Sequence, residues 1–305
     1  MEKKDFMRLE NMCQTRFTEA GNCFHICSQE NHPVIFHNKL ECTAAMNIMA
    51  YVAIMFQDIR IYTFEIMDNH IHILASGDRS RIEQFLHTLV MKMAAIPELK
   101  ASSSDIKRLI FKIILVESLD NFRNVIAYIN RNGFVVSADY SPFSYPWGAN
   151  RYFFNEEAKL RFQESGQIAT YRQKRHMFHS DLISELKDII ILDGYVSPMN
   201  YCHISDAESV YRSSRHYFQS VSRNIESAKD IAKTIGESIF YSDEDLFSYV
   251  ASLCSKQYRK PSIQLLSKDE KTEIARVLHY DYNAGNKQIS RILKLEIEIV
   301  NQLFP

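Results

Sequence analysis

Two histidines lie one residue apart in the apolar segment IMDNHIHILASG, residues 66–77. On a β-strand, residues two apart point to the same face, so His70 and His72 would project side by side while Ile71 enters the core. Two neutral imidazoles placed in this way can clamp a divalent metal ion, and such an ion can polarise a phosphoryl oxygen. The alternative is that both rings face solvent on an exposed side of a sheet.

A second candidate group lies in the segment NFRNVIAYINRNGF, residues 121–134. If this segment is a helix, Tyr128 and Asn132 are four residues apart and share one face. The amide oxygen of Asn132 could then supply a third metal ligand, and the phenol of Tyr128 could serve as a nucleophile at the same ion. The alternative is that Tyr128 is a core residue whose hydroxyl reaches water.

The elements that must position these side chains follow from hydrophobic periodicity. The pattern predicts strands at 22–29, 59–77 and 106–118, the second with a turn at 68–69, and helices at 39–56, 79–96 and 121–132. These elements predict an α+β fold, with helices on one face of a small antiparallel sheet.

The length of 305 residues leaves room for roughly two domains. A Pro- and aromatic-rich segment at 137–154, which holds the only tryptophan, Trp147, is typical of the end of a domain. We therefore expect a first domain at 1–154, a helical accessory region at 155–260 and a three-helix module at 261–305. Ser242 is a candidate N-cap, and Ser267 and Glu270 have the spacing of a capping box.

The C-terminal segment 286–304 has the pattern of a helix-turn-helix, with its turn at 293–295. In such modules the second helix enters the major groove of DNA. Here the second helix carries Glu296 and Glu298 and lacks Lys and Arg, which disfavours phosphate contact. DNA reading, protein docking and a purely structural module all remain open.

Composition limits the class of protein. The chain is 46% hydrophobic and has six cysteines without a C-x-x-C pair, which disfavours a zinc knuckle or a disulfide framework. Its apolar runs are shorter than the about 20 residues of a membrane span, and its N-terminus does not resemble a signal peptide, so we expect a cytoplasmic protein. Residues 100–175 hold 12 Lys and Arg against 7 Asp and Glu, although the net charge of the chain is −1. This basic excess indicates a modest affinity for polyanions.

The order of the motifs resembles that of the REP-associated tyrosine transposases, within the larger group of single-strand DNA transposases and nucleases with a His-hydrophobic-His motif (the HUH superfamily). The family pattern is a strand with Asn-His-hydrophobic-His, a helix with Tyr four residues before Asn or Gln, and an aromatic segment around Trp-Ser-Ser-Tyr. The matching stretches of this sequence are DNHIHIL, YINRN and SPFSYPWGANRY, and CFHICSQ is similar to the family's first strand. The resemblance covers about residues 20–154.

The sequence departs from the family pattern at two positions. Gly133 follows Asn132 where the family usually has proline, and glycine there suits a helix end equally well. Asp68 stands where many members have proline before Asn-His. Neither departure removes a candidate ligand.

The resemblance implies a ferredoxin-like or RRM-like nuclease domain that uses Mg or Mn. His70, His72 and Asn132 would be the metal ligands, and Tyr128 would be the nucleophile. The product would be a 5′-phosphotyrosine and a free 3′-hydroxyl, so that cleavage can be reversed by rejoining. The implied partner is single-stranded or hairpin DNA from palindromic repeats, bound by a monomer or a homodimer.

Single-stranded DNA is held by basic groups along its backbone and by aromatic stacking of its bases. Each candidate could instead be a solvated charge or a packed ring. The candidates near Tyr128 are Arg123, Arg131, Lys107, Arg108, Trp147, Arg151 and Tyr152.

Two other functions remain open. The protein could be a domesticated descendant that grips DNA hairpins or regulates transcription without cutting. It could also be a hydrolase of small phosphoesters that uses the same metal site, which would leave Tyr128 without a role.

Overall fold

The computed structural model describes residues 3–28, 34–136, 144–180, 188–223, 241, 243–280, 282 and 284–304. The chain forms two units, unit 1 with residues 1–134 and 139–224, and unit 2 with residues 135–138 and 225–305. The predicted boundaries at 154/155 and 260/261 do not coincide with this division. Residues 144–180 and 188–223 belong to the same unit as the predicted first domain, and the C-terminal unit includes a helix before residue 260. The predicted N-cap Ser242 and residues 137–143 of the aromatic segment lie outside the described residues.

Unit 1 is built on an antiparallel four-stranded sheet with the strand order β2-β3-β1-β4. Its strands are β1 (Cys23–Ser28), β2 (Arg60–Ile66), β3 (Ile71–Ser76) and β4 (Phe111–Val116). The predicted strands and the predicted turn at 68–69 are confirmed. The amide of Met67 donates to the carbonyl of His70 at 2.9 Å and closes that turn.

The two faces of the sheet differ in polarity. Residues paired across strands share a face, and His72 lies opposite Cys27 on one side and Glu65 on the other. The opposite face is apolar, with Ile73 between Ile26 and Phe64. The register therefore gathers the polar side chains of three strands on one face.

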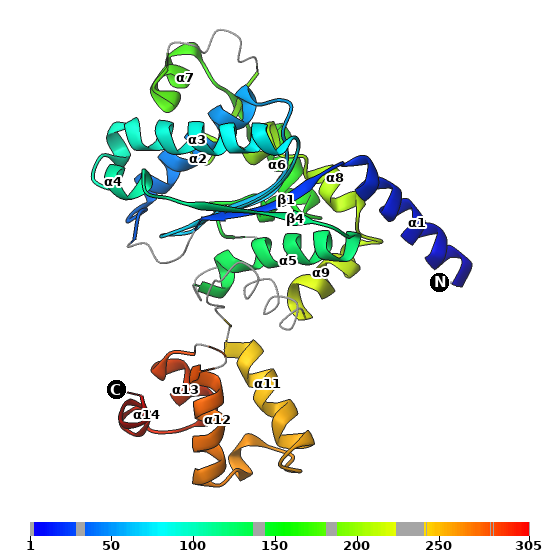
Figure 1. The fold of residues 1–305 in the computed structure, drawn as a ribbon, viewed down its shortest axis with the longest axis vertical. Coiled ribbons are helices and arrows are strands. Elements are labelled where there is room, and N and C mark those ends of the chain that lie inside the picture. The colour runs from blue at the N-terminus through cyan, green and yellow to red at the C-terminus, as the bar shows by residue number, and fades with distance from the viewer. Residues whose placement is uncertain are drawn as a thin grey trace. The chain divides into compact units, whose positions relative to one another are not determined.

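Helices cover both faces of the sheet (Figure 1). The helices α2 (Lys39–Met55) and α3 (Arg79–Ala95) lie on the apolar face, and α5 (Leu119–Val136) lies on the other. The expectation of helices on one face only was therefore wrong. The helix α5 shields the polar face from water, and the histidines and the carboxylate on that face are buried.

Side-chain caps fix where these helices begin. Asn38 accepts a hydrogen bond from the amide of Glu41 at 3.1 Å, at the start of α2. Asp78 accepts from the amide of Ser80 at 2.8 Å, at the start of α3. Ser118 accepts from the amide of Asn121 at 3.2 Å, at the start of α5.

Residues 144–223 attach to the free edge of β2. The amide of Ile66 donates to the carbonyl of Trp147 at 2.8 Å, and the amide of Ala149 donates to the carbonyl of Phe64 at 3.2 Å. Gly148 allows this approach, because a Cβ at that position would lie 2.8 Å from the carbonyl oxygen of Phe64. The elements of this segment are η2 (Asn150–Tyr152), α6 (Glu156–Ser165), β5 (Gln167–Ile168), α7 (Tyr171–Phe178), β6 (Ile190–Leu192), β7 (Tyr195–Val196), η3 (Pro198–Asn200), α8 (Ile204–Ser209) and α9 (Ser214–Arg223).

A buried hydrogen-bond network joins this segment to α5 and the sheet. Thr63 donates to the side chain of Asn130, whose amide nitrogen donates to the hydroxyl of Tyr217 at 2.9 Å. The Tyr217 hydroxyl donates in turn to Asn150 at 2.6 Å, and Asn150 donates to the carbonyl of Asn130 at 2.6 Å. Since buried polar groups are costly unless paired, this closed network specifies how α5 sits on the sheet.

The N-terminal part of unit 1 holds the helix α1 (Lys3–Glu19), and two short helices precede β4. These are η1 (Pro97–Leu99) and α4 (Ser103–Ile106). Within the described residues, no helix combines the length and the apolar character that crossing a membrane requires.

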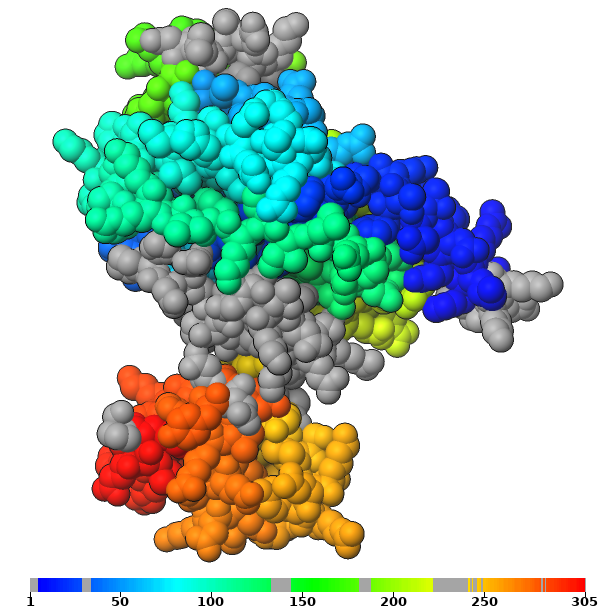
Figure 2. Space-filling view, in the orientation of Figure 1, coloured from blue at the N-terminus to red at the C-terminus, as the bar shows by residue number. Residues whose placement is uncertain are grey.

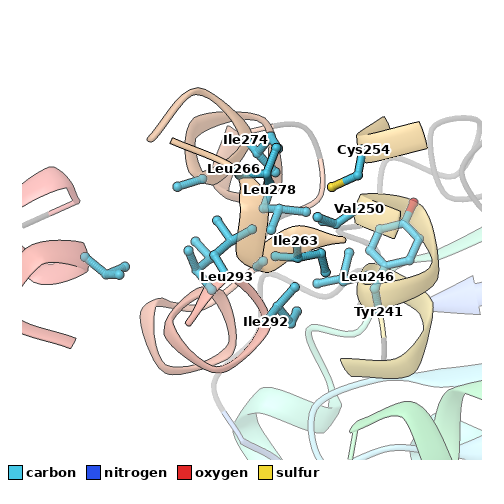
Figure 3. Packing of buried hydrophobic residues seen from close by; sticks show 14 of the residues in the cluster. Tyr241, Leu246, Val250, Cys254, Ile263, Leu266, Ile274, Leu278, Ile292 and Leu293 are labelled. Atoms are coloured by element: carbon cyan, nitrogen blue, oxygen red, sulfur yellow. The ribbon is translucent and has the colours of Figure 1, made fainter. Parts of the chain in front are cut away.

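Unit 2 has its own apolar core, which includes Leu246, Ile274, Leu278 and Leu293 (Figure 3). The predicted capping box is confirmed, since the amide of Glu270 donates to Ser267 Oγ at 3.2 Å and the amide of Ser267 donates to the Glu270 carboxylate. Its elements are α11 (Asp243–Lys256), η4 (Ile263–Leu265), α12 (Lys268–Tyr280), α13 (Asn286–Leu293) and α14 (Ile297–Leu303). The three helices predicted after residue 267 are thus confirmed.

The turn between α13 and α14 lies one residue later than predicted, at 294–296. Lys294 ends α13 in the left-handed conformation, with φ 53°. Ile289, Ile292 and Val300 are buried, as the pattern predicts. The helix pair is therefore present, and its use as a DNA-reading module stays a prediction.

Candidate functional site

Three predicted site residues come together between the sheet and α5. The ring centroids of His70 and His72 lie 4.8 Å apart, and the ring of Tyr128 lies 5.5 Å from that of His72. His70 ends the turn before β3, His72 lies on β3 and Tyr128 lies on α5. All three are buried, with exposed fractions of 4%, 0% and 5%. The solvent-facing alternative for the two histidines is therefore wrong.

The side chain of Asn69 orients the first imidazole. Nδ1 of His70 lies 2.6 Å from Oδ1 of Asn69. Because an amide oxygen only accepts, Nδ1 carries the hydrogen and Nε2 keeps its lone pair. Metal-binding histidines are commonly held in one tautomer by such a contact.

Burial keeps the imidazoles neutral. It lowers the pKa of His72 to about 3. Burial, followed by the nearby His72, holds the pKa of His70 well below its usual range. Neutral imidazoles at neutral pH are the form that binds a metal ion.

His25 is a third histidine of this site, and our sequence analysis did not assign it there. It lies on β1, and its ring stacks on that of His72 with centroids 5.6 Å apart and lies 5.9 Å from that of Tyr128. Within the described part of the chain its Nε2 is buried without a hydrogen-bond partner. Burial first, and then His72, hold its pKa well below the usual range. The sequence feature that could have pointed to His25 is its position within the predicted first strand, two residues from Cys23 and Cys27 on the same face.

Glu65 was also missed. It pairs with His72 across β2 and β3, and only 1% of it is exposed. Lys112 of β4 lies opposite Cys27 and so shares the face of His72. Neither residue could be placed from sequence, since strand order and register decide which strands carry neighbouring side chains.

Asn132, the predicted third ligand, lies one turn after Tyr128 on α5 and is partly buried. The helix continues past Gly133 to Val136, so the expectation that Gly133 suits a helix end is wrong. In the described ranges, no three His, Cys, Asp or Glu side chains are grouped to hold a metal ion. An amide ligand such as Asn132 is not among those residue types.

The separation of the two imidazoles leaves room for one divalent ion between them. Two rings that each bind one ion through a nitrogen at about 2.1 Å place their centroids roughly 5 Å apart. The 4.8 Å between His70 and His72 agrees with this separation. Mg and Mn prefer oxygen ligands. The side-chain amide of Asn132 and the phosphate of a substrate could each supply one.

The basic candidates on α5 have structural partners. Arg123 is 4% exposed, its Nη1 lies 2.6 Å from the carboxylate of Glu10, and its Nε donates to the carbonyl of Val210 at 2.7 Å. Arg131 is 5% exposed. Arg123 thus ties α1 and α8 to α5 and does not face solvent as a phosphate contact would.

The candidates after residue 144 are likewise engaged within the fold. Arg151 forms an ion pair with Asp193 at 3.0 Å, and Tyr152 is 1% exposed with its hydroxyl bonded to Ser197. Trp147 is 8% exposed and packs near Tyr195. These three side chains therefore have partners within the fold, and their contact with DNA stays a prediction.

Lys107 and Arg108 are the two predicted DNA contacts that lie exposed. Both follow α4, and the side chain of Arg108 is 75% exposed with only a long, 3.7 Å ion pair to Asp105. They remain candidates for contact with a polyanion.

Comparison of the chain with models of protein families, with curated proteins and with solved structures finds no match. Function therefore has to be argued from the site itself.

Proposed function

We propose that the protein is a metal-dependent tyrosine nuclease and strand transferase that cleaves and rejoins single-stranded hairpin DNA, of the REP-associated tyrosine transposase type. The observation that carries this proposal is the convergence of His70, His72 and Tyr128, with ring separations of 4.8 and 5.5 Å. His70 comes from the turn before β3, His72 from β3, and Tyr128 from α5, 56 residues after His72. A phenol beside two paired imidazoles would be a nucleophile beside a metal site.

The order of the elements supports the same proposal. From β1 to β4 the chain runs strand, helix, strand, strand, helix, strand, apart from the two short helices before β4. Together with the sheet order β2-β3-β1-β4, this order of elements supports the ferredoxin-like domain that the resemblance implies. In it the two central strands, β1 and β3, carry His25 and His72.

In the proposed reaction, His70, His72 and Asn132 would hold Mg or Mn, and the ion would neutralise the nonbridging oxygens of the scissile phosphate. Tyr128 attacks the phosphorus through its phenol oxygen, and the bond from phosphorus to the 3′-oxygen breaks. The phenol proton passes to a base and from it to the departing 3′-oxygen, which leaves as a hydroxyl. The candidate for this base is His25, whose ring lies 5.9 Å from that of Tyr128, centroid to centroid. Rejoining is the reverse attack of the 3′-hydroxyl on the phosphotyrosine.

The test uses an end-labelled DNA hairpin with single-stranded flanks, incubated with the full chain and Mn or Mg. We expect a covalent adduct that survives denaturation, which Tyr128→Phe abolishes while hairpin binding persists. The matched control is Tyr62→Phe, a tyrosine of β2 whose hydroxyl bonds Ser76 at 2.9 Å and which should leave the adduct intact.

Three outcomes would contradict the proposal. A hairpin whose electrophoretic mobility shifts without formation of a covalent adduct indicates a non-cleaving hairpin binder or regulator. Hydrolysis of small phosphoesters that persists in Tyr128→Phe indicates a phosphoesterase. An adduct that persists in Tyr128→Phe shows that another residue is the nucleophile.

A further inference from the structure

The helix α7 carries a concentration of basic residues outside the site just described. Residues 170–180, TYRQKRHMFHS, include Arg172, Lys174 and Arg175 together with two histidines, and no Asp or Glu. The helix starts with a capping box in which the amide of Gln173 donates to Thr170. Its end is anchored by Phe178, which is 1% exposed and packs on Tyr51 of α2 with ring centroids 5.2 Å apart. The charges are thus displayed on an ordered helix.

An open cavity lies along this helix. Its volume is about 550 Å³, and it is lined by Arg172, Arg175, His176, His179 and Ser180. Each of these five side chains can donate a hydrogen bond, and none of the lining residues that the structure describes has a carboxylate or an aliphatic side chain. Bidentate donors such as Arg, grouped in this way, are suited to phosphate oxygens.

Two acidic side chains near this helix, among the residues that the structure describes, have partners of their own. Asp193 forms ion pairs with Arg151 at 3.0 Å and with Arg161 at 2.6 Å. Glu98 lies 3.0 Å from His179 at the border of the cavity. A further cation, Lys92 of α3, lies 5.0 Å from the centre of the ring of Tyr51, which belongs to α2.

This helix also carries part of the basic segment of the sequence. Within residues 100–175, Arg123 and Lys159 pair with Glu10 and Glu208, and Arg151 and Arg161 pair with Asp193. The exposed cations of the segment include Lys107 and Arg108 after α4, and Arg172 and Arg175 of α7. Tyr171, at the start of the helix, is 58% exposed and can stack on a base.

We propose that α7 and its cavity bind the phosphate backbone of nucleic acid. The choice of single-stranded DNA as ligand rests on the proposed function, whereas the affinity for a phosphate chain rests on α7 alone. Figure 2 shows α7, in green, at the surface of unit 1 beside α2 and α3. Because Tyr128 lies on the α5 side of the sheet, α7 would hold a part of the DNA away from the scissile phosphate. A membrane surface is disfavoured, since the described residues that line the cavity offer no apolar side chain for insertion.

The test compares the wild-type chain with the double variant Arg172→Gln/Arg175→Gln. The probe is a fluorescein-labelled single-stranded oligonucleotide of mixed sequence, followed by anisotropy without divalent metal. We expect the affinity at about 100 mM salt to fall at least about tenfold, and the slope of log K against log salt to become shallower by about 1.4, the value for two lost phosphate contacts. Tyr171→Ala should weaken binding further without a change in that slope.

The control is Arg8→Gln/Arg16→Gln, which removes the same charge from exposed positions of α1 in the same unit. It should lower the affinity less than about twofold. An equal loss of oligonucleotide affinity in the two double variants would overturn the inference. Oligonucleotide affinity that does not change in Arg172→Gln/Arg175→Gln would overturn it as well. Binding of anionic lipid vesicles that depends on α7, without oligonucleotide binding, would also overturn it.

The adduct assay separates this inference from the proposed function. Adduct formation with α7-independent binding refutes the role of α7 only. Binding that depends on α7 without any adduct refutes the nuclease only. Melting curves of both double variants check that the fold is intact.

Discussion

The ring of Tyr128 stands perpendicular to that of His72, with an interplanar angle of 89° and 5.5 Å between the centroids. This edge contact places a potential nucleophile beside one half of a potential metal clamp. It depends on the rotation of α5 about its axis, which Ser118 fixes at the start of the helix and the Thr63–Asn130 hydrogen bond fixes near the site. The geometry is thus set by contacts outside the three site residues.

Metal binding should depend on both imidazoles of the clamp. His70→Ala and His72→Ala should each weaken Mn binding at least about tenfold, because each removes one ligand. Calorimetric titration of Mn into each variant measures the effect. His87→Ala, at an exposed position of α3, is the control. Unchanged affinity in the two site variants would show that Mn binds elsewhere.

Replacing His25 should slow the chemical step rather than binding. In His25→Phe we expect the rate of adduct formation to fall by about 10²-fold or more, the usual contribution of a general base, with hairpin affinity retained. Single-turnover kinetics and anisotropy measure the two quantities. An unchanged rate would assign the phenol proton to another acceptor. His87→Phe serves as the control.

Acid should destabilise unit 1 through its buried histidines. The unfolded chain takes up protons on His25, His70 and His72 below their usual pKa of about 6.5, whereas burial lowers the folded-state pKa, to about 3 for His72. Their contribution to stability is therefore fully present above pH about 6.5 and is lost as the pH falls toward the folded pKa. His72 alone should account for a loss of about 2 kcal/mol at pH about 5.

Urea unfolding in the presence of a chelator, followed by the fluorescence of Trp147, measures this loss. His72→Phe should flatten the pH profile. A free energy of unfolding that does not change between neutral pH and pH about 5 would contradict the prediction.

The loop at Gly148 should not tolerate a side chain. In Gly148→Ala the new Cβ would lie 2.8 Å from the carbonyl oxygen of Phe64, so the loop must shift and its pairing with β2 weakens. We expect a loss of about 1–3 kcal/mol in the free energy of unfolding. Gly285→Ala is the control, since its Cβ meets no atom within 4 Å. Denaturant titration followed by circular dichroism compares them, and equal losses would contradict the prediction.

Arg123 should matter for stability more than for DNA binding. Arg123→Met removes an ion pair with Glu10 and a bond to the carbonyl of Val210, which should cost about 2–4 kcal/mol because Arg123 is buried. Arg108→Met, at a 75% exposed side chain, should cost less than about 0.5 kcal/mol. The free energies of unfolding test this order. A reversed order would place Arg123 outside the core.

The sequence determined the elements and the local pairs. The strands, the turn at 68–69, the main helices and the capping box of Ser267 follow from periodicity and cap residues, which act over a few residues. The proximity of His70 to His72 could be anticipated, because two residues of separation suffice to bring their rings together.

The tertiary structure alone decided which side chains share a face. His25 and Glu65 lie at the site because β1 and β2 flank β3 in a particular register. Arg123 is buried because it pairs with Glu10, which lies on a helix more than 100 residues away in sequence. Strand order, register and long-range ion pairs depend on the packing of the whole unit, and short-range patterns do not contain them.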